Sequence, residues 1–224
     1  VSVCPKSTPD CEQTGETLIA RMLEYEVDRT VISHVCYYGR NNDYPTHCVQ
    51  TWPDRFAAIG LLVGHRLFPP QDGERNAERL RELVTERGLA GLRLSPIYDR
   101  DVRWLDDALC DSLWVAAGDL GVTFNVFLAP EQLQQLGVMA ERHPAVNVVI
   151  DHFAMIDINR PDEEGIDRIV ELARLPNIHV RTSLHNPSKQ KRPPFHDMWP
   201  YLRCVYDAFG PRRLLWANFY EYLI

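Results

Sequence analysis

The chain has 224 residues, of which 45% are hydrophobic and 25% are charged, a composition that excludes long disordered segments, collagen-like repeats and coiled coils. Acidic residues outnumber basic ones by 31 to 24, and the formal net charge of −7 argues against nucleic acid as the main partner. No apolar run approaches the roughly 18–20 residues that cross a bilayer, so we expect no membrane partner.

Seven short apolar runs alternate with amphipathic segments along the chain. The runs predict strands at residues 29–36, 56–63, 91–95, 122–128, 146–150, 178–183 and 214–217. Apolar residues at helical spacing predict helices over 16–26, 74–87, 105–120, 131–142, 166–173 and 202–209, and a weaker helix over 45–51. Gly88, Gly121 and Gly210 follow three of these helices, where a left-handed cap favours glycine.

This alternation is typical of parallel βα units and leaves two architectures, an open doubly wound sheet or a (β/α)8 barrel missing one strand. The dinucleotide-binding sheet needs a G-x-G-x-x-G loop after its first strand, and the chain has neither that loop nor a P-loop. We therefore predict the α/β class and a TIM-like (β/α)8 barrel that lacks its first strand.

The amino terminus and the cysteines bear on the cellular setting. Residues 1–5 include no initiator Met and do not resemble a signal peptide, so the chain is expected to be processed, cut or a fragment. The six cysteines are scattered, with no C-x-x-C pair. We expect them to be reduced and the protein to be cytoplasmic.

Polar residues recur at the carboxyl ends of the predicted strands, where the active site of such a barrel lies. They are His34, Tyr37, Tyr38, His65, Arg66, Arg93, Asn125, Asp151, His152, Arg181, Ser183, His185, Asn218 and Glu221. Two arginines and a histidine at this end would form a cationic mouth that orients a carboxylate, because guanidinium grips carboxylate bidentately. Asn125 and Ser183 are further candidates for binding the substrate.

Several segments, taken in order and spacing, resemble the amidohydrolase-2 family. They are GLRL at 91–94, VIDH at 149–152, PNIHVR at 176–181 and GPRRLLW at 210–216, with support from residues 25–31 and 52–56. The family comprises metal-dependent or metal-free TIM-barrel hydrolases and decarboxylases, including a pyrone-dicarboxylate lactonase. The resemblance covers about residues 17–222. It implies one domain over residues 1–224, with 1–16 as an amino-terminal loop and a chain truncated at both ends.

The resemblance also implies roles for individual residues. His152 falls on the histidine that ends the family's sixth strand, which is a metal ligand or polarises the substrate. Arg93 and Arg181 fall where family members hold substrate carboxylates. Asp151 is expected to point away from the barrel interior, because neighbours in a strand face opposite sides. The structural alternatives are a strand-end cap for His152 and buried ion pairs with Asp or Glu for the two arginines.

The departures from the family concern metal binding and the general base. No H-x-H motif occurs, and the family's last-strand W-G-[ST]-D reads W-A-N-F at 216–219. Asn218 or Phe219 therefore stands where a proton acceptor belongs, and Glu221 could substitute only if the backbone brings it inward. His152 is the one credible metal ligand, whereas a site needs three or four. We expect no tightly held metal in this chain, and zinc only if upstream residues belong to the native protein.

The first functional hypothesis is a hydrolase that acts on a small carboxylate-bearing lactone or cyclic acid, with a decarboxylase on the same scaffold as an equal possibility. His152 would polarise the scissile carbonyl, while Arg93 and Arg181 would anchor the carboxylate. The second hypothesis is a catalytically inactive member that serves as a ligand-binding or assembly subunit. An incomplete barrel exposes two strand edges, so we expect a homo-oligomer or a longer native chain.

Overall fold

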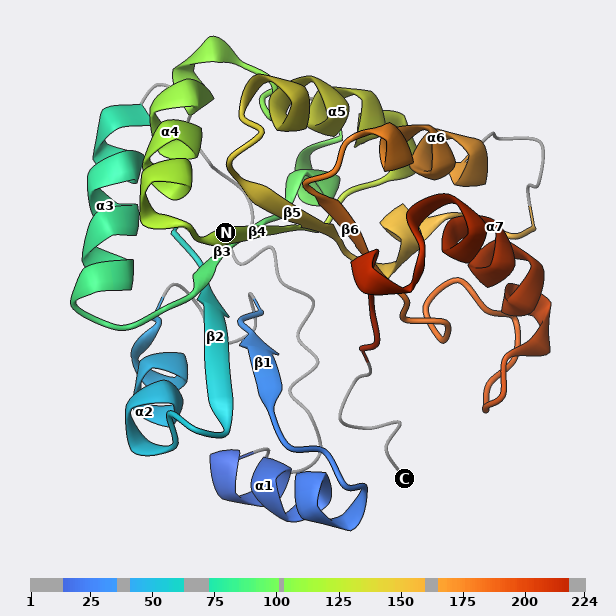
Figure 1. Cartoon of the computed structure of the whole chain (residues 1–224), viewed down its shortest axis with the longest axis horizontal. Coiled ribbons are helices and arrows are strands. Elements are labelled where there is room, and N and C mark those ends of the chain that lie inside the picture. The colour runs from blue at the N-terminus through green and yellow to red at the C-terminus, as the bar shows by residue number, and fades with distance from the viewer. Residues whose placement is uncertain (1–13, 36–40, 63–72, 101–102, 160–164, 218–224) are drawn as a thin grey trace.

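Seven parallel strands form a single curled sheet in the computed structural model, which describes residues 14–35, 41–62, 73–100, 103–159 and 165–217. The strands are β1 (Thr30–Ser33), β2 (Phe56–Gly60), β3 (Gly91–Leu94), β4 (Thr123–Val126), β5 (Asn147–Ile150), β6 (Ile178–Arg181) and β7 (Leu214–Leu215). They lie side by side in chain order, each pairing with the next (Figure 1). This order is that of a TIM barrel and differs from that of a doubly wound sheet, which confirms the predicted fold class.

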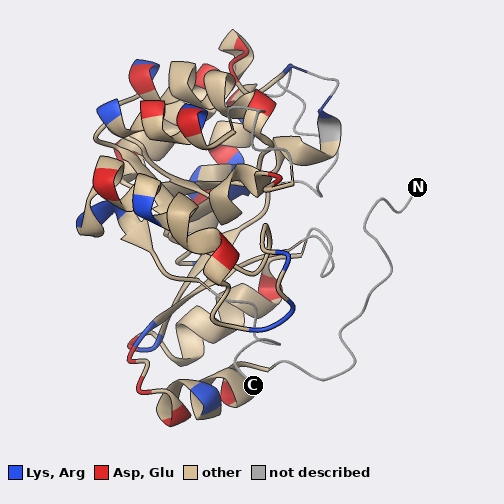
Figure 2. Ribbon diagram, turned by 90° about the vertical axis from the view of Figure 1, so that its right-hand side faces the viewer, with Lys and Arg blue, Asp and Glu red and all other residues tan. Residues whose placement is uncertain are grey.

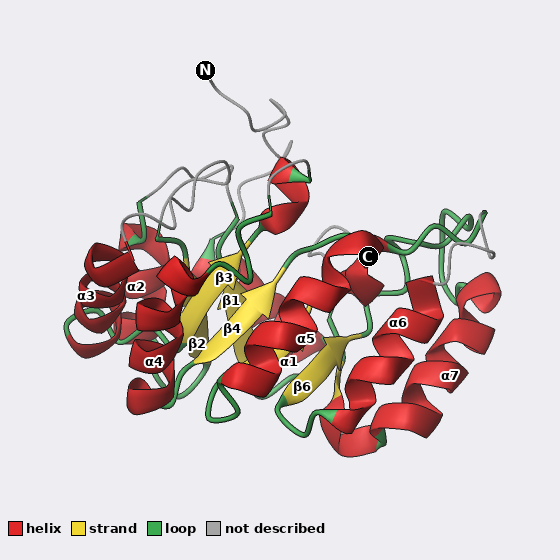
Figure 3. Ribbon diagram, turned by 90° about the horizontal axis from the view of Figure 1, so that it is seen from above, coloured by secondary structure: helices red, strands yellow, loops and turns green. Residues whose placement is uncertain are grey.

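The helices cover the outer face of the sheet, as Figure 3 shows from above. They are α1 (Gly15–Glu24), α2 (Asp43–Thr51), α3 (Gly73–Thr85), α4 (Asp111–Leu120), α5 (Leu133–Arg142), α6 (Gly165–Glu171) and α7 (Trp199–Phe209). Basic residues (Lys, Arg) and acidic residues (Asp, Glu) are interspersed along these helices (Figure 2). Within the parts of the chain that the structure describes, no helix has the length and apolar character needed to span a membrane.

All seven strands and seven helices predicted from the sequence are present, and one predicted boundary shifts by more than the others. The helix expected from residue 105 begins only at Asp111, after a short 3-10 turn over Ala108–Cys110. The Asp107 carboxylate accepts a hydrogen bond from the Leu109 amide at 2.9 Å and so caps that turn. A capping aspartate offers the backbone an alternative to continuous helix, which explains the later start. Gly88, Gly121 and Gly210 all have positive φ, as expected of helix exits.

The hydrophobic core lies between the sheet and the helices. Alternate strand residues point into it and are almost fully buried, namely Leu92, Leu94, Phe124, Val126, Val148, Ile150, Ile178 and Val180. Burying each such side chain contributes about 1.5–3 kcal/mol to stability. Gly91 allows β3 and β4 to approach closely, because a Cβ there would lie 1.8 Å from the carbonyl oxygen of Thr123.

The ring of strands stays open between β1 and β7 in the described part of the chain. Among the residues that the structure describes, each of these two strands pairs with a single neighbour. Val31 on β1, Leu215 on β7 and the following Trp216 are exposed apolar residues at this opening. The arrangement matches the expected absence of one strand. Of the six cysteines, Cys48, Cys110 and Cys204 are free thiols, and the other three lie outside the described residues.

Candidate functional site

The strand residues that point away from the core form the inner surface of the curled sheet. Register places Arg93 of β3 beside Asn125 of β4, Asn125 beside Val149 of β5, and Val149 beside His179 of β6. Side chains alternate between the two faces of a strand, so these four residues share the inner face. Arg181, two residues after His179 and the last residue of β6, lies on the same face.

Two of the predicted site residues converge on a single carboxylate. Arg93 donates a hydrogen bond from Nε to Oδ2 of Asp151 at 3.1 Å, and Nη1 of Arg181 lies 3.0 Å from Oδ1 of Asp151. The Asp151 side chain is fully buried, whereas those of Arg93 and Arg181 are 10% and 12% exposed. We call Arg93, Asp151, Arg181 and His152 the inner cluster. Two guanidiniums pair with one carboxylate, so the inner cluster as a whole carries one net positive charge.

The expectation that Asp151 points away from the barrel interior is wrong. Asp151 comes two residues after Val149, so strand alternation keeps it on the inner face with Val149. Alternation would place Asp151 on the outer face only if the strand continued through His152 with the imidazole pointing inward. β5 ends at Ile150, and the backbone turns at His152.

That turn is left-handed and contains no glycine. His152, Phe153, Ala154 and Met155 have φ values of 52°, 52°, 51° and 54°. Such backbone costs roughly 1–2 kcal/mol for each non-glycine residue, so other interactions must hold it. Phe153 and Ala154 are fully buried in the core, and the Ala154 amide donates to the carbonyl oxygen of Asp151 at 2.9 Å.

The turn places the His152 ring among aromatic side chains next to the ion pairs. Its ring centre lies 5.7 Å from that of Phe127 and 6.4 Å from that of His185. The Phe127 ring also contacts the Arg93 guanidinium, whose central carbon lies 4.7 Å from the ring centre. Phe127 therefore links Arg93 to His152. Phe127 lies within the strand predicted over 122–128, but the sequence analysis assigns it no role. Its position two residues after Asn125 places both residues on the same face of that strand, and this spacing could have identified it.

Burial decides the protonation state of the imidazoles. It lowers the pKa of His152 to about 4; Asp151 opposes this shift, while Arg93 and Arg181 add to it. Burial likewise lowers the pKa of His185. Burial also lowers the pKa of Arg181, which Asp151 counteracts. Near neutral pH the site thus combines uncharged imidazole with permanent guanidinium charge, and an uncharged imidazole can polarise a carbonyl by donating a hydrogen bond.

Asn125 and Ser183 supply buried polar groups without partners. Both residues are almost completely buried, and neither Nδ2 of Asn125 nor Oγ of Ser183 has a hydrogen-bond partner among the described residues. An unpaired buried donor is costly unless a bound ligand pairs with it. Asn125 lies next to Arg93 in the sheet, which places its amide beside the inner cluster.

The described residues do not fit a metal ion. No three His, Cys, Asp or Glu side chains among them are placed to bind one. The buried carboxylate of Asp151 is engaged by two guanidiniums, whose charge disfavours a further cation. The prediction of no tightly held metal stays a prediction, because Asn218, Phe219 and Glu221 lie outside the described residues. So do Tyr37, Tyr38, His65 and Arg66.

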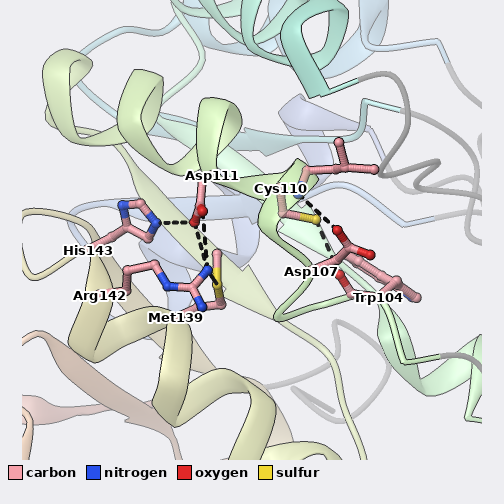
Figure 4. A network of polar contacts seen from close by, with 8 residues as sticks. Trp104, Asp107, Cys110, Asp111, Met139, Arg142 and His143 are labelled. Atoms are coloured by element: carbon pink, nitrogen blue, oxygen red, sulfur yellow. Dashed lines mark hydrogen bonds and ion pairs between the residues drawn. The ribbon is translucent and has the colours of Figure 1, made fainter.

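A second group of Arg, Asp and His lies on the outer helices and serves as a comparison (Figure 4). Asp111, at the start of α4, is 2.7 Å from Nε2 of His143 and accepts from Nη1 of Arg142 at 3.0 Å. The His143 ring stacks on Trp114 with centres 5.7 Å apart. Burial acts to raise the pKa of Asp111, but the hydrogen bonds from His143 and Arg142 lower it below its usual value. We call Asp111, Arg142 and His143 the outer cluster; it ties α4 to the end of α5.

Comparisons with known proteins agree with the barrel. The family model described as Amidohydrolase matches residues 8–217. L-fucono-1,5-lactonase of Burkholderia ambifaria is 30% identical over 165 residues, which cover 73% of this chain and 56% of that protein. 4-Sulfomuconolactone hydrolase of Hydrogenophaga intermedia is 25% identical over 216 residues, which cover 95% of this chain and 66% of that protein. The chain thus spans less than two thirds of the length of either relative.

Solved structures agree in fold. A protein of Acinetobacter baumannii assigned as a 2-pyrone-4,6-dicarboxylic acid hydrolase, crystallised with citric acid bound, superposes with a TM-score of 0.77 at 18% identity. The match covers 98% of this chain and 78% of that chain. At this identity the likeness shows a shared barrel fold.

Proposed function

The chain belongs to the Amidohydrolase family, and from that premise we propose that it is a hydrolase acting on a small carboxylate-bearing lactone or cyclic acid. The observation that carries the proposal is the inner cluster, in which two buried guanidiniums and an uncharged imidazole meet at the carboxyl ends of β3, β5 and β6. The lactonase and lactone hydrolase among its relatives support the same reaction class.

Arg93 and Arg181 would anchor the carboxylate of the substrate. Each makes a single contact with Asp151, and their remaining N–H groups have no partner among the described residues. Guanidinium N–H groups that are nearly dry and already oriented bind a carboxylate with little loss of entropy. The central carbon of the Arg93 guanidinium lies 4.7 Å from the ring centre of Phe127, a contact that helps to hold the guanidinium in place.

His152 would polarise the scissile carbonyl. Because its pKa is about 4, the ring is uncharged near pH 7 and can donate a hydrogen bond to oxygen. The charge that develops on this oxygen during attack by water also lies in the positive field of the two guanidiniums. The same guanidiniums would also bind the carboxylate of a decarboxylation substrate, so a decarboxylase on this scaffold is the alternative.

The test is turnover of a lactone panel that includes L-fucono-1,5-lactone, 4-sulfomuconolactone and carboxylated 2-pyrones. We expect His152→Gln to lower kcat/KM for the best substrate by about 100-fold, the usual effect of losing a hydrogen bond to a developing oxyanion. His143→Gln is the matched control, because it removes an imidazole that contacts a carboxylate in the outer cluster, and it should leave kcat/KM within about twofold.

Ligand binding without turnover of any lactone or cyclic acid would refute the proposal and favour the inactive binding or assembly subunit. Equal losses in the two variants would remove His152 from the reaction. A cytoplasmic location and a homo-oligomeric state stay predictions; the apolar residues exposed beside β1 and β7 support the second.

A further inference from the structure

The inner cluster has an unequal number of positive and negative groups. Two arginines face one aspartate, and the pairing uses only Nε of Arg93 and Nη1 of Arg181. The ionisable groups that affect the pKa of His152 are these same three residues and His185. Both histidines have lowered pKa values and add no charge near neutral pH. The described surroundings therefore offer a ligand one net positive charge.

We infer that Asp151 determines specificity: by occupying one side of both guanidiniums, it sets the site to accept a ligand with one carboxylate in preference to a ligand with two. The inference rests on the proposed role of Arg93 and Arg181 as the carboxylate anchor. Asp151 acts through the arginines and does not itself touch the ligand, so it is a positioning residue.

A single ligand carboxylate can pair with the free N–H groups of both arginines and bring the buried group to neutrality. A second carboxylate on the same ligand would meet no remaining cation among the described residues and would be repelled by Asp151. Asp151 is fully buried, so solvent screens this repulsion weakly.

The rest of the described site offers no compensation for a second carboxylate. Next to the three charged residues lie the Phe127 ring, the uncharged imidazoles of His152 and His185, and the Asn125 amide, none of which carries positive charge near neutral pH. Asn125 can donate a hydrogen bond to a neutral carbonyl or hydroxyl of the ligand, because its buried Nδ2 has no partner among the described residues. The inferred substrate class is therefore a monocarboxylate with an uncharged oxygen function elsewhere.

The experiment compares two planar ring acids that differ by one carboxylate, benzoate and isophthalate, by titration calorimetry on the 224-residue chain. The readout is the ratio of the Kd for isophthalate to the Kd for benzoate. We expect this ratio to exceed one in the unaltered protein and to fall by about tenfold or more in Asp151→Asn, in which the site gains one positive charge. The matched control, Asp111→Asn, removes the corresponding carboxylate of the outer cluster and should leave the ratio unchanged.

Arg181→Gln supplies the opposite charge change and keeps the inference testable if Asp151→Asn does not fold. The Arg93–Asp151 pair remains in that variant, the site loses its net charge, and the ratio should rise by about tenfold. A purely structural role of Asp151 would weaken both ligands alike and leave the ratio constant, which would overturn the inference.

Binding and turnover separate this inference from the proposed function. If the protein hydrolyses lactones but the ratio of the two Kd values is the same in Asp151→Asn, the inference is wrong and the proposed function stands. If the ratio shifts as expected but no lactone or cyclic acid is turned over, the proposed hydrolase is wrong and the inference stands. If neither acid binds the unaltered protein, the arginines are not a carboxylate anchor and the inference fails with that role.

Discussion

The inner and outer clusters both consist of Arg, Asp and His residues, but only the inner cluster has the properties of a binding site. In the outer cluster the aspartate pairs with both its arginine and its histidine (Figure 4), and the side chains of the aspartate and the arginine are partly exposed. In the inner cluster the aspartate is taken up by two arginines. A left-handed turn carries the histidine beside it away from the strand direction.

Burial sets the second difference. The side chains of Asp111 and Arg142 are 35% and 40% exposed, so water screens their attraction. Asp151 is completely buried, and its arginines are nearly so. The exposed ion pairs of the outer cluster connect two helices and contribute little to stability. The buried ion pairs of the inner cluster leave one positive charge without a counter-ion, which a ligand can supply.

The largest expected contrast is in stability. Asp151→Ala leaves two buried guanidiniums without their carboxylate, and we expect it to lower the free energy of unfolding by about 3–5 kcal/mol. Asp111→Ala should cost about 1 kcal/mol, because its partners reach solvent. Urea unfolding of the two variants measures both values. Equal losses would mean that the inner ion pairs are no more buried in solution than the outer ones.

The second prediction concerns pH. The folded-state pKa of His152 is about 4, below its ordinary value of 6.5, so the unfolded chain binds the proton first. The stabilising contribution is complete above about pH 6.5 and is lost as the pH falls toward 4, by on the order of 3 kcal/mol. His185 shifts in the same direction and adds to the loss.

His152→Gln isolates that contribution. It should flatten the fall in unfolding free energy between pH 6.5 and 4, whereas His143→Gln should preserve the steep fall of the unaltered protein. The measurement is urea unfolding at half-unit pH steps. A His152→Gln profile that runs parallel to the unaltered one would show that His152 is not buried as an uncharged ring.

The sequence predicted the elements of the fold well because they depend on local pattern. Apolar runs separated by amphipathic helices determine a parallel sheet, and all seven strands follow that pattern. The helix predicted over 105–120 begins instead at Asp111, because apolar spacing alone does not reveal that Asp107 caps a separate turn. Helix boundaries depend on such side-chain competition more than on periodicity.

The sequence predicts which residues belong to the site but does not predict how their side chains are oriented. Arg93, Arg181, Asn125 and His152 follow from their places near the carboxyl ends of strands, and the structure brings both arginines beside His152. The orientation of Asp151 was missed because it depends on where β5 ends. A left-handed turn without glycine has no sequence signature, so nothing marked His152 as the first residue outside the strand.

The third prediction concerns the fork geometry of Arg93. Arg93→Lys keeps the charge but loses the planar group that contacts both Asp151 and Phe127. We expect KM for a carboxylated substrate to rise by about tenfold, with a smaller change in kcat. Arg142→Lys, the equivalent change in the outer cluster, should leave both constants within about twofold. Similar kinetic losses in the two variants would remove Arg93 from substrate binding.

The smallest expected effect tests the strain of the left-handed turn. Ala154 lies in that turn with φ 51° and ψ 27°, whereas Ala140 lies in α5, and both side chains are fully buried. Ala140→Gly loses a packed methyl group and helix propensity, a cost of about 1–2 kcal/mol. Ala154→Gly loses the same methyl group but gains relief of roughly 1 kcal/mol of backbone strain, so its free energy of unfolding should change by less than about 0.5 kcal/mol.

Because both substitutions delete one buried methyl, the difference between them reports the backbone alone. If Ala154→Gly costs as much as Ala140→Gly, the turn stores no strain, and the position of His152 needs no compensating interactions from the core.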